Sequence, residues 1–143
     1  MAEDKALTER QRLEALAAFL PVFDSPGFIF GNWEQPPAEP DGSLRFASFV
    51  PSPDAQAFLE EVGRGGWVID GFDWKAWNVT PEAVALRRGD GFERATPIAL
   101  ARLLTALIRQ DRFVEGTLAE AHESGLLRRI AARAAELVET TPP

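Results

Sequence analysis

Charged side chains that could do chemistry are concentrated between residues 109 and 123. The candidate residues of this segment are Arg109, Asp111, Arg112, Glu115 and Glu123. An arginine can hold an anionic group through the parallel N–H groups of its planar fork, and a carboxylate can act as an acceptor or a base. One hypothesis is therefore a pocket in which these side chains bind a small ligand or catalyse a reaction.

The same five residues also allow a purely structural interpretation. Here Arg112 bridges to Glu115 or Glu123, and Asp111 caps the next helix. Because an unpaired buried charge is costly, both hypotheses predict that these charges are buried and paired. They differ in whether solvent reaches the guanidinium group of Arg112.

A second segment, Asp73 to Trp77, could add an aromatic wall to such a pocket. If it is helical, Trp74 and Trp77 lie on one side at a spacing of three, and Asp73 is well placed as the N-cap. Ordinary core packing would explain two tryptophans equally well. A buried indole N–H needs a hydrogen-bond acceptor, for which the candidates are Asp111, Glu115 and Glu123.

Both segments resemble the motifs of a known family. The run from Arg109 to Gly116, with Leu118 and the segment 123–125 after it, is similar to the Arg-x-Asp-Arg-Phe-x-Glu-Gly signature of small bacterial proteins that carry domain of unknown function six-five-zero-eight. The segment 72–77 is similar to that family's Asp-Trp-x-x-Trp motif. The resemblance covers roughly residues 52–137 and implies no particular activity. Many members read Cys-Glu-Gly-His where this chain has residues 114–117, so no role here can rest on a thiol or on an imidazole at position 117.

The charged segment must be positioned by the helices on either side of it. Thr96 and Pro97 are typical of a helix start, and an apolar stripe at spacings of three and four follows, made of Leu100, Leu103, Leu104, Leu107 and Ile108. Gly116 could mark a break after this helix, and Gly125 precedes a last helix predicted over residues 126–138. The charged segment therefore lies between two helices with buried faces.

Similar signals predict the other helices. Apolar spacing predicts a helix from Leu7 to Leu20, which Pro21 should end. Ser52 and Pro53 should begin a helix through Val62, and Thr80 and Pro81 a short one to Leu86. The predicted fold class is mainly α, a compact bundle of about five helices.

A small β-hairpin is also predicted near residues 28–50. Residues 28–30 and 44–50 are β-like runs, and the loop 34–43 between them has turn chemistry at Asp41 and Gly42. The inward-facing residues would be either Leu44, Phe46 and Ser48 or Arg45, Ala47 and Phe49. Trp33 and Trp67 lie in loop-like or strand-like contexts, and an exposed tryptophan in either place would indicate an interface.

Length and composition limit the possible number of domains and the possible chemistry. The chain has 143 residues and no cysteine, so residues 1–139 are expected to form one globular domain with a short tail at 140–143, and thiol chemistry is excluded. The charged start and the absence of a long apolar run predict a cytoplasmic protein with no membrane segment.

The charge is uneven along the chain. Residues 1–73 hold 13 acidic and 5 basic side chains, whereas residues 74–143 hold 9 and 10. An acidic face would steer the protein toward a partner with a basic surface and would repel nucleic-acid phosphates. Nucleic-acid binding is therefore not expected unless the arginines of the second half cluster on one side, namely Arg87, Arg88, Arg94, Arg102, Arg109, Arg112, Arg128, Arg129 and Arg133.

Three functional classes remain. A protein-binding or regulatory module requires nothing that the sequence lacks, and it is the favoured interpretation. A small-ligand-binding protein or an enzyme would use the arginine and carboxylate cluster walled by tryptophan, but no convincing nucleophile is present. A nucleic-acid-associated factor is the third. The only histidine, His122, matches no strong metal-ligand spacing, so neither a metal nor a cofactor is expected.

Overall fold

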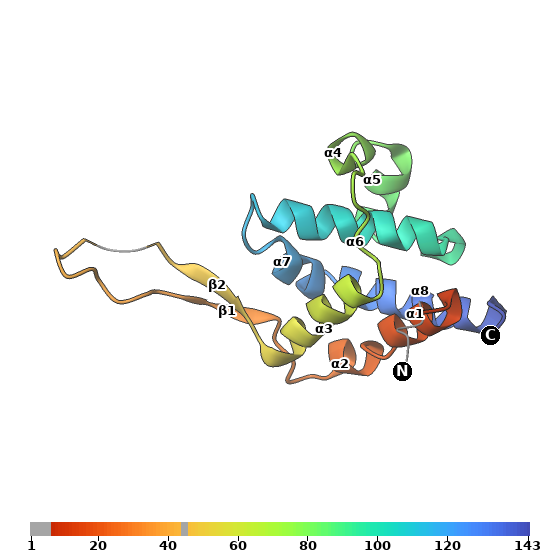
Figure 1. Cartoon of the computed structure of the whole chain (residues 1–143), viewed down its shortest axis with the longest axis horizontal. Coiled ribbons are helices and arrows are strands. Elements are labelled where there is room, and N and C mark those ends of the chain that lie inside the picture. Colours follow the sequence, from red (N-terminus) through yellow and green to blue (C-terminus); the bar gives the residue numbers. More distant parts are fainter. Residues whose placement is uncertain (1–6, 44–45) are drawn as a thin grey trace, which may run out of the picture.

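The computed structural model of this chain describes residues 7–43 and 46–143, and it is mainly helical (Figure 1). One small antiparallel sheet accompanies the helices. The elements in order are α1 (Glu9–Ala17), α2 (Leu20–Asp24), β1 (Gly31–Glu34), β2 (Ser48–Pro51), α3 (Pro53–Arg64), α4 (Trp74–Trp77), α5 (Pro81–Arg87), the 3-10 helix η1 (Phe92–Arg94), α6 (Pro97–Asp111), α7 (Thr117–Glu123) and α8 (Leu126–Thr140).

The mainly α class is confirmed, but the number of helices is larger than the five predicted. Pro21 does not simply end the first helix, because α1 already ends at Ala17 and Pro21 lies in the first turn of α2. Proline is tolerated there, since the first N–H groups of a helix have no partner within it. Helices α4 and α7 are the other additions, and glycines with positive φ, Gly116 and Gly125, separate α7 from its neighbours.

Local capping explains where three of the predicted helices begin. The hydroxyl groups of Ser52, Thr80 and Thr96 each accept a hydrogen bond from the backbone N–H three residues further on, at 3.2 Å in each case. A proline follows each of them as the first helical residue. The predicted starts of α3, α5 and α6 are therefore confirmed.

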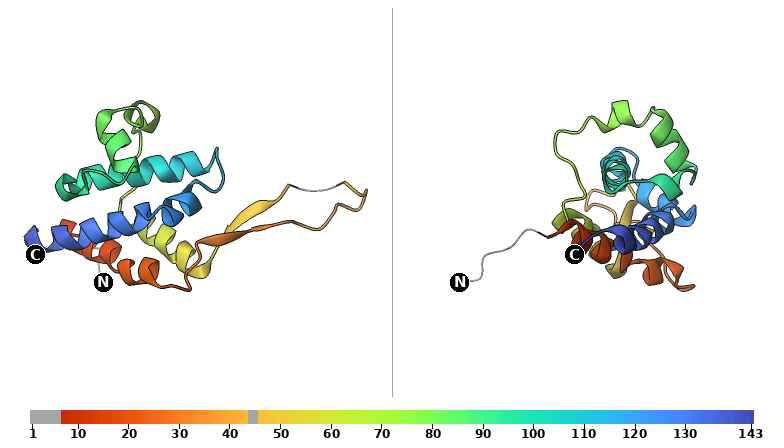
Figure 2. Two further views of the ribbon diagram at one scale, coloured as in Figure 1. Left: turned by 180° about the vertical axis from the view of Figure 1, so that it is seen from behind. Right: turned by 90° about the vertical axis from the view of Figure 1, so that its right-hand side faces the viewer.

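The helices pack around α6 and α8. Helix α8 contacts α1, α2 and α7, and α6 packs on α7 and α8. Helices α4 and α5 also contact α6 and cover its far side (Figure 2). The apolar stripe of α6 is confirmed as core, because Leu100, Leu103, Leu104 and Leu107 are buried and Ile108 is partly buried.

The predicted hairpin is present, but its strands are shifted. Gly31 pairs with Pro51 and Glu34 with Ser48. The first strand therefore begins one residue after the predicted run 28–30. The second strand begins at Ser48, near the end of the predicted run 44–50, and extends one residue beyond it. Phe30 is buried and packs near His122 of α7, and its carbonyl oxygen accepts a hydrogen bond from the Ser52 N–H at 2.8 Å just before the first strand begins. The two strands and the described residues between them stand out from the helices as an arm (Figure 1).

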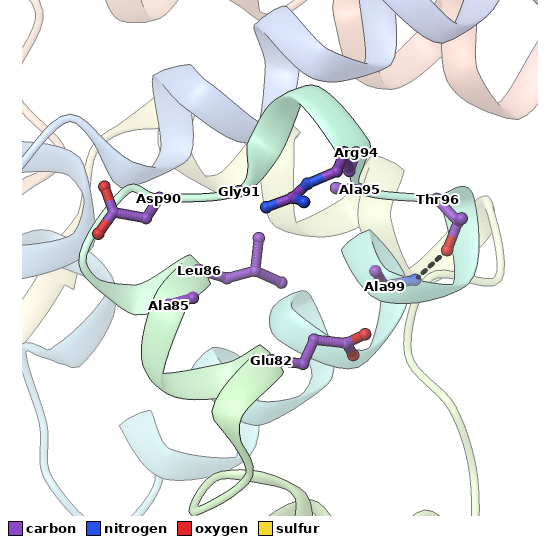
Figure 3. A pocket seen from close by; sticks show the side chains of 9 residues that line it. All are labelled: Glu82, Ala85, Leu86, Asp90, Gly91, Arg94, Ala95, Thr96 and Ala99. Atoms are coloured by element: carbon purple, nitrogen blue, oxygen red, sulfur yellow. Dashed lines mark hydrogen bonds between the residues drawn. The ribbon is translucent and has the colours of Figure 1, made fainter.

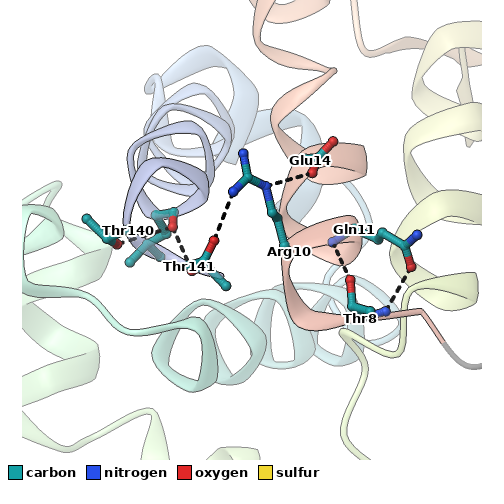
Figure 4. Close-up of polar contacts among 7 residues, drawn as sticks. Thr8, Arg10, Gln11, Glu14, Thr140 and Thr141 are labelled. Atoms are coloured by element: carbon teal, nitrogen blue, oxygen red, sulfur yellow. Dashed lines mark hydrogen bonds and ion pairs between the residues drawn. The ribbon is translucent and has the colours of Figure 1, made fainter. Parts of the chain in front are cut away.

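Neither predicted inward-facing set is buried along this arm. Phe46 is 94% exposed, Phe49 is half-buried, and Leu44 and Arg45 lie outside the described residues. Phe49, at the base of the arm, packs against the core, but the described residues further out have no core to select one set. In the expected tail, α8 runs to Thr140, and the Thr141 carbonyl accepts a hydrogen bond from Arg10 Nη1 at 3.1 Å (Figure 4). Within residues 7–43 and 46–143, no helix has the length and apolarity to cross a membrane.

Candidate functional site

The predicted charged cluster does not form one site. Arg109 makes a loose ion pair with Asp70, with 3.7 Å between Nη2 and Oδ1, and Asp70 is fully exposed. Asp111, two residues further on, faces α7 instead, where its Oδ1 accepts a hydrogen bond from the backbone N–H of Leu118 at 3.0 Å. The two side chains therefore serve different neighbours.

The contact of Asp111 confirms its predicted role as a helix cap. Gly116 is the N-cap residue of α7 and has no side chain to offer to the free N–H groups of the first turn. Asp111, at the end of α6, supplies the missing acceptor. It thereby ties the end of α6 to the first turn of α7.

Replacing Asp111 with alanine is expected to lower the free energy of unfolding by about 1 kcal/mol, the usual cost of a lost N-cap. Urea unfolding followed by tryptophan fluorescence measures the change. Asp111→Asn keeps an acceptor oxygen and should lose clearly less. Equal losses in the two variants would contradict a role based on the accepted hydrogen bond.

The prediction that Arg112 is buried and paired at this junction is wrong. It is the C-cap residue of α6, it is exposed, and its guanidinium group makes no hydrogen bond or ion pair with residues 7–43 or 46–143. The helix ends one residue earlier, so the side chain no longer follows the buried stripe of α6. Solvent reaches Arg112 freely.

Glu115 joins the α6–α7 turn to the arm. Its Oε1 accepts a hydrogen bond from the backbone N–H of Phe49 at 2.8 Å. Phe49 lies opposite Trp33 in the sheet, and its N–H points outward from β2. Glu115 therefore occupies the place that a further strand would take.

The two tryptophans of the second motif have different surroundings. Trp77 is 8% exposed, and its indole N–H donates to Glu82 at 2.9 Å rather than to one of the three predicted carboxylates. Trp74 is half-buried and stacks on the exposed ring of Phe113, with 6.4 Å between the ring centroids. Asp73 caps α4 as predicted, accepting from the Ala76 N–H at 3.1 Å.

A cavity of about 450 Å³ lies between the base of the arm and α7. Of the predicted cluster, only Glu115 and Glu123 line it, and Glu120 adds a third carboxylate. The other lining residues include the aromatic side chains of Phe28, Phe30, Trp33 and Phe49. Sequence reasoning missed Glu120 and these phenylalanines as site residues, although the pair Phe28 and Phe30 was a visible aromatic signal.

His122 forms part of the same cavity wall. Its ring makes an edge contact with Phe28, with 4.7 Å between centroids, and also packs near Phe23 and Phe30. Burial lowers the pKa of the imidazole, while the Glu123 carboxylate acts in the opposite direction, and the buried Nδ1 atom has no hydrogen-bond partner among the described residues. The lowered pKa favours a neutral ring near pH 7.

A smaller cavity of about 210 Å³ lies between α5, η1 and the start of α6 (Figure 3). Leu86 forms part of its wall, and Glu82, Asp90 and Arg94 supply charged groups. Neither this cavity nor the larger one is lined by Arg109, Asp111, Arg112, Trp74 or Trp77.

Comparison with known proteins agrees with the resemblance that the motifs suggested. The model of a family of unknown function, DUF6508, matches residues 8–140. The chain belongs to this family. The DUF6508 match includes the arm, α4 and the α6–α7 turn, so all of the elements discussed above are part of the family domain. No curated protein and no solved structure matches the chain significantly.

The described part of this DUF6508 domain offers no metal centre. Among residues 7–43 and 46–143, no group of three or more histidine, aspartate or glutamate side chains is arranged to hold a metal ion. The side chains at the base of the arm include three carboxylates, one imidazole and several aromatic rings.

Proposed function

We propose that this DUF6508 domain is a protein-binding module that docks a partner with a basic surface on its arm and the adjoining α6–α7 turn. The observation that carries the proposal is the exposure of Trp33, 55% of which faces solvent on a two-stranded arm outside the helical core. Tryptophan is among the side chains that contribute most to protein interfaces. An exposed tryptophan on a projecting element supports a role in binding a partner more than a role in stabilising the fold.

Further exposed apolar side chains adjoin Trp33. Phe113 and Val114, in the α6–α7 turn, are 73% and 56% exposed. Trp33 reaches this turn, because a Cβ atom on Gly116 would lie only 3.1 Å from its ring. Phe113 continues the surface to Trp74 on α4 by stacking. We call the surface formed by Trp33, Phe113, Val114 and Trp74 the turn surface.

Carboxylates at the Trp33 end of the turn surface support a basic partner there, whereas at the other end the Lys75 ammonium lies over the rings of Trp74 and Phe113, at 5.8 and 5.4 Å from their centroids. Glu115 lies in the turn itself, and Glu120 and Glu123 lie on the adjacent α7. The first 73 residues, which include the arm, have a net charge of −8. Opposite charge on a partner would speed association and fix its orientation on the apolar contacts.

The test uses a photo-reactive amino acid in place of Trp33 in the full chain. Cross-linking in cells should capture a basic protein, which is then purified and titrated against the purified chain. The same amino acid at Ile98, a half-exposed position at the start of α6, is the matched control. Cross-linking to the same protein from both positions would contradict the proposal, and so would cross-linking to a second copy of this acidic chain.

Variants then test the turn surface on the purified pair. Trp33→Ala should raise the dissociation constant about 30-fold, the effect of losing a contact worth about 2 kcal/mol. Phe113→Ser should weaken binding less, Ile98→Ser should leave it unchanged, and added salt should weaken it in all cases. A change of less than threefold in Trp33→Ala would overturn the proposal.

A further inference from the structure

The cavity at the base of the arm has an excess of negative charge. Glu115, Glu120 and Glu123 line it, whereas no lysine or arginine does. Within the described chain, none of these three carboxylates forms an ion pair with a basic side chain. Their charges are therefore available to a ligand.

The hydrogen bonds of the cavity leave room for a donor. Glu115 uses Oε1 to accept from the Phe49 N–H, and its second oxygen has no partner among residues 7–43 and 46–143. Glu120 and Glu123, on α7, are both exposed. A group that donates several hydrogen bonds would find acceptors on two sides, from the turn and from α7.

Aromatic side chains form part of the remaining wall. Phe30 and Phe49 stand nearly parallel, with 6.3 Å between centroids and 20° between planes, and Trp33 meets Phe49 edge-on at 5.5 Å. Phe30 and Phe49 cover each other, so the aromatic ring open to a cation is that of Trp33, which is 55% exposed, and the carboxylates beside it add direct charge. An anion or a purely apolar group would meet only part of this lining favourably.

We propose that this cavity binds the cationic end of a side chain, the guanidinium group of arginine or the ammonium group of lysine. The volume of about 450 Å³ is far more than one water molecule needs. That the cation comes from a protein rests on the proposed function, since Trp33 belongs both to the cavity lining and to the turn surface, so a basic segment on that surface would lie next to the cavity. Binding of this cation would then fix the position of the partner along the turn surface.

The first experiment needs no identified partner. The isotopically labelled full chain is titrated with acetyl-Gly-Arg-Gly-amide and observed by NMR. The amide signals of Gly31 and Gly116, two cavity residues, should shift and saturate. The lysine peptide should shift the same signals. The citrulline peptide, neutral and nearly identical in shape to the arginine peptide, should bind at least about tenfold more weakly.

Charge-removing variants locate the site. The double variant Glu115→Gln and Glu123→Gln should weaken binding of the arginine peptide at least about tenfold, the effect of losing charge-assisted hydrogen bonds. Glutamine at position 115 keeps an acceptor for the Phe49 N–H, so the turn should stay attached to the arm. Glu139→Gln, on exposed α8 surface, is the matched control and should bind as the unmodified chain does.

The outcomes separate this inference from the proposed function. Equal binding of the arginine and citrulline peptides, or absence of shifts at Gly31 and Gly116, overturns the cation site even if Phe113→Ser still weakens the partner complex. If the peptide binds in the cavity while Trp33→Ala and Phe113→Ser leave the partner complex unchanged, the protein-binding proposal fails and the cation site stands. Should the double variant not fold, the comparison with citrulline decides the question alone.

Discussion

Replacing Thr105 with valine is expected to lower the free energy of unfolding by about 3 kcal/mol, because two backbone groups would lose their partner in the interior. Thr105 lies in α6 and is fully buried. Its hydroxyl group accepts from the Ile69 N–H at 3.0 Å, and its one proton faces two carbonyl oxygens, that of Ala101 at 2.7 Å and that of Trp67 at 3.1 Å. This one oxygen atom thus ties the segment after α3 to the central helix.

Urea unfolding compares Thr105→Val with Thr105→Ser. Serine keeps the hydroxyl group and loses one methyl group, so its loss should be near 1 kcal/mol. Valine keeps the shape and loses the hydrogen bonds. If valine proves no worse than serine, the buried hydrogen bonds do not contribute as the structure indicates.

Replacing Gly31 with alanine is expected to separate the two strands at the base of the arm. A Cβ atom there would lie 2.3 Å from the backbone oxygen of Val50 and 2.8 Å from the Cα atom of Pro51. Both are backbone atoms, so no side-chain rotation relieves the clash. We expect a loss of about 2–3 kcal/mol, the usual cost of overfilling a packed site.

The damage should be confined to the arm. Hydrogen exchange should speed up at the backbone amides of residues 48–50 and change little in α6 and α8. Gly63→Ala is the matched control, since Gly63 lies within α3 and a Cβ atom there would meet nothing within 4 Å. Alanine should stabilise that helix by up to about 1 kcal/mol. Unchanged exchange in the arm of Gly31→Ala would contradict the close approach of the strands.

Helix starts could be predicted from the sequence because their signals are local. A hydroxyl side chain, a proline after it and an apolar stripe fall within one or two turns of chain, as at Thr96 and Pro97 for α6. The Asp73 cap of α4 follows the same rule. Such signals act before distant parts of the chain meet.

The strands were harder to predict, because their ends depend on what each residue packs against. Phe28 and Phe30 have the composition of a strand, but both pack near His122 of α7. Pairing is thus delayed to Gly31, where the absence of a side chain lets β2 approach. No local pattern encodes this competition.

The arrangement of the charged cluster likewise could not be predicted from local patterns. A spacing of three or four places Asp111, Arg112 and Glu115 near one face only if the helix continues. Gly116 has a φ of +99°, and α7 leaves in a new direction. Asp111 then caps α7, Glu115 holds the arm, and Arg112 faces solvent.

The sequence by itself determined the mainly α class, the starts of the main helices, the buried stripe of α6 and the family. Tertiary structure alone decided that Trp67 is 1% exposed and Trp33 55% exposed, although both lie in similar local contexts. It also brought Glu115 and Glu123 to one cavity with Phe30 and Phe49. The physical reason is that helix signals act between neighbours in the chain, whereas burial, strand pairing and cavities arise from contacts between distant segments.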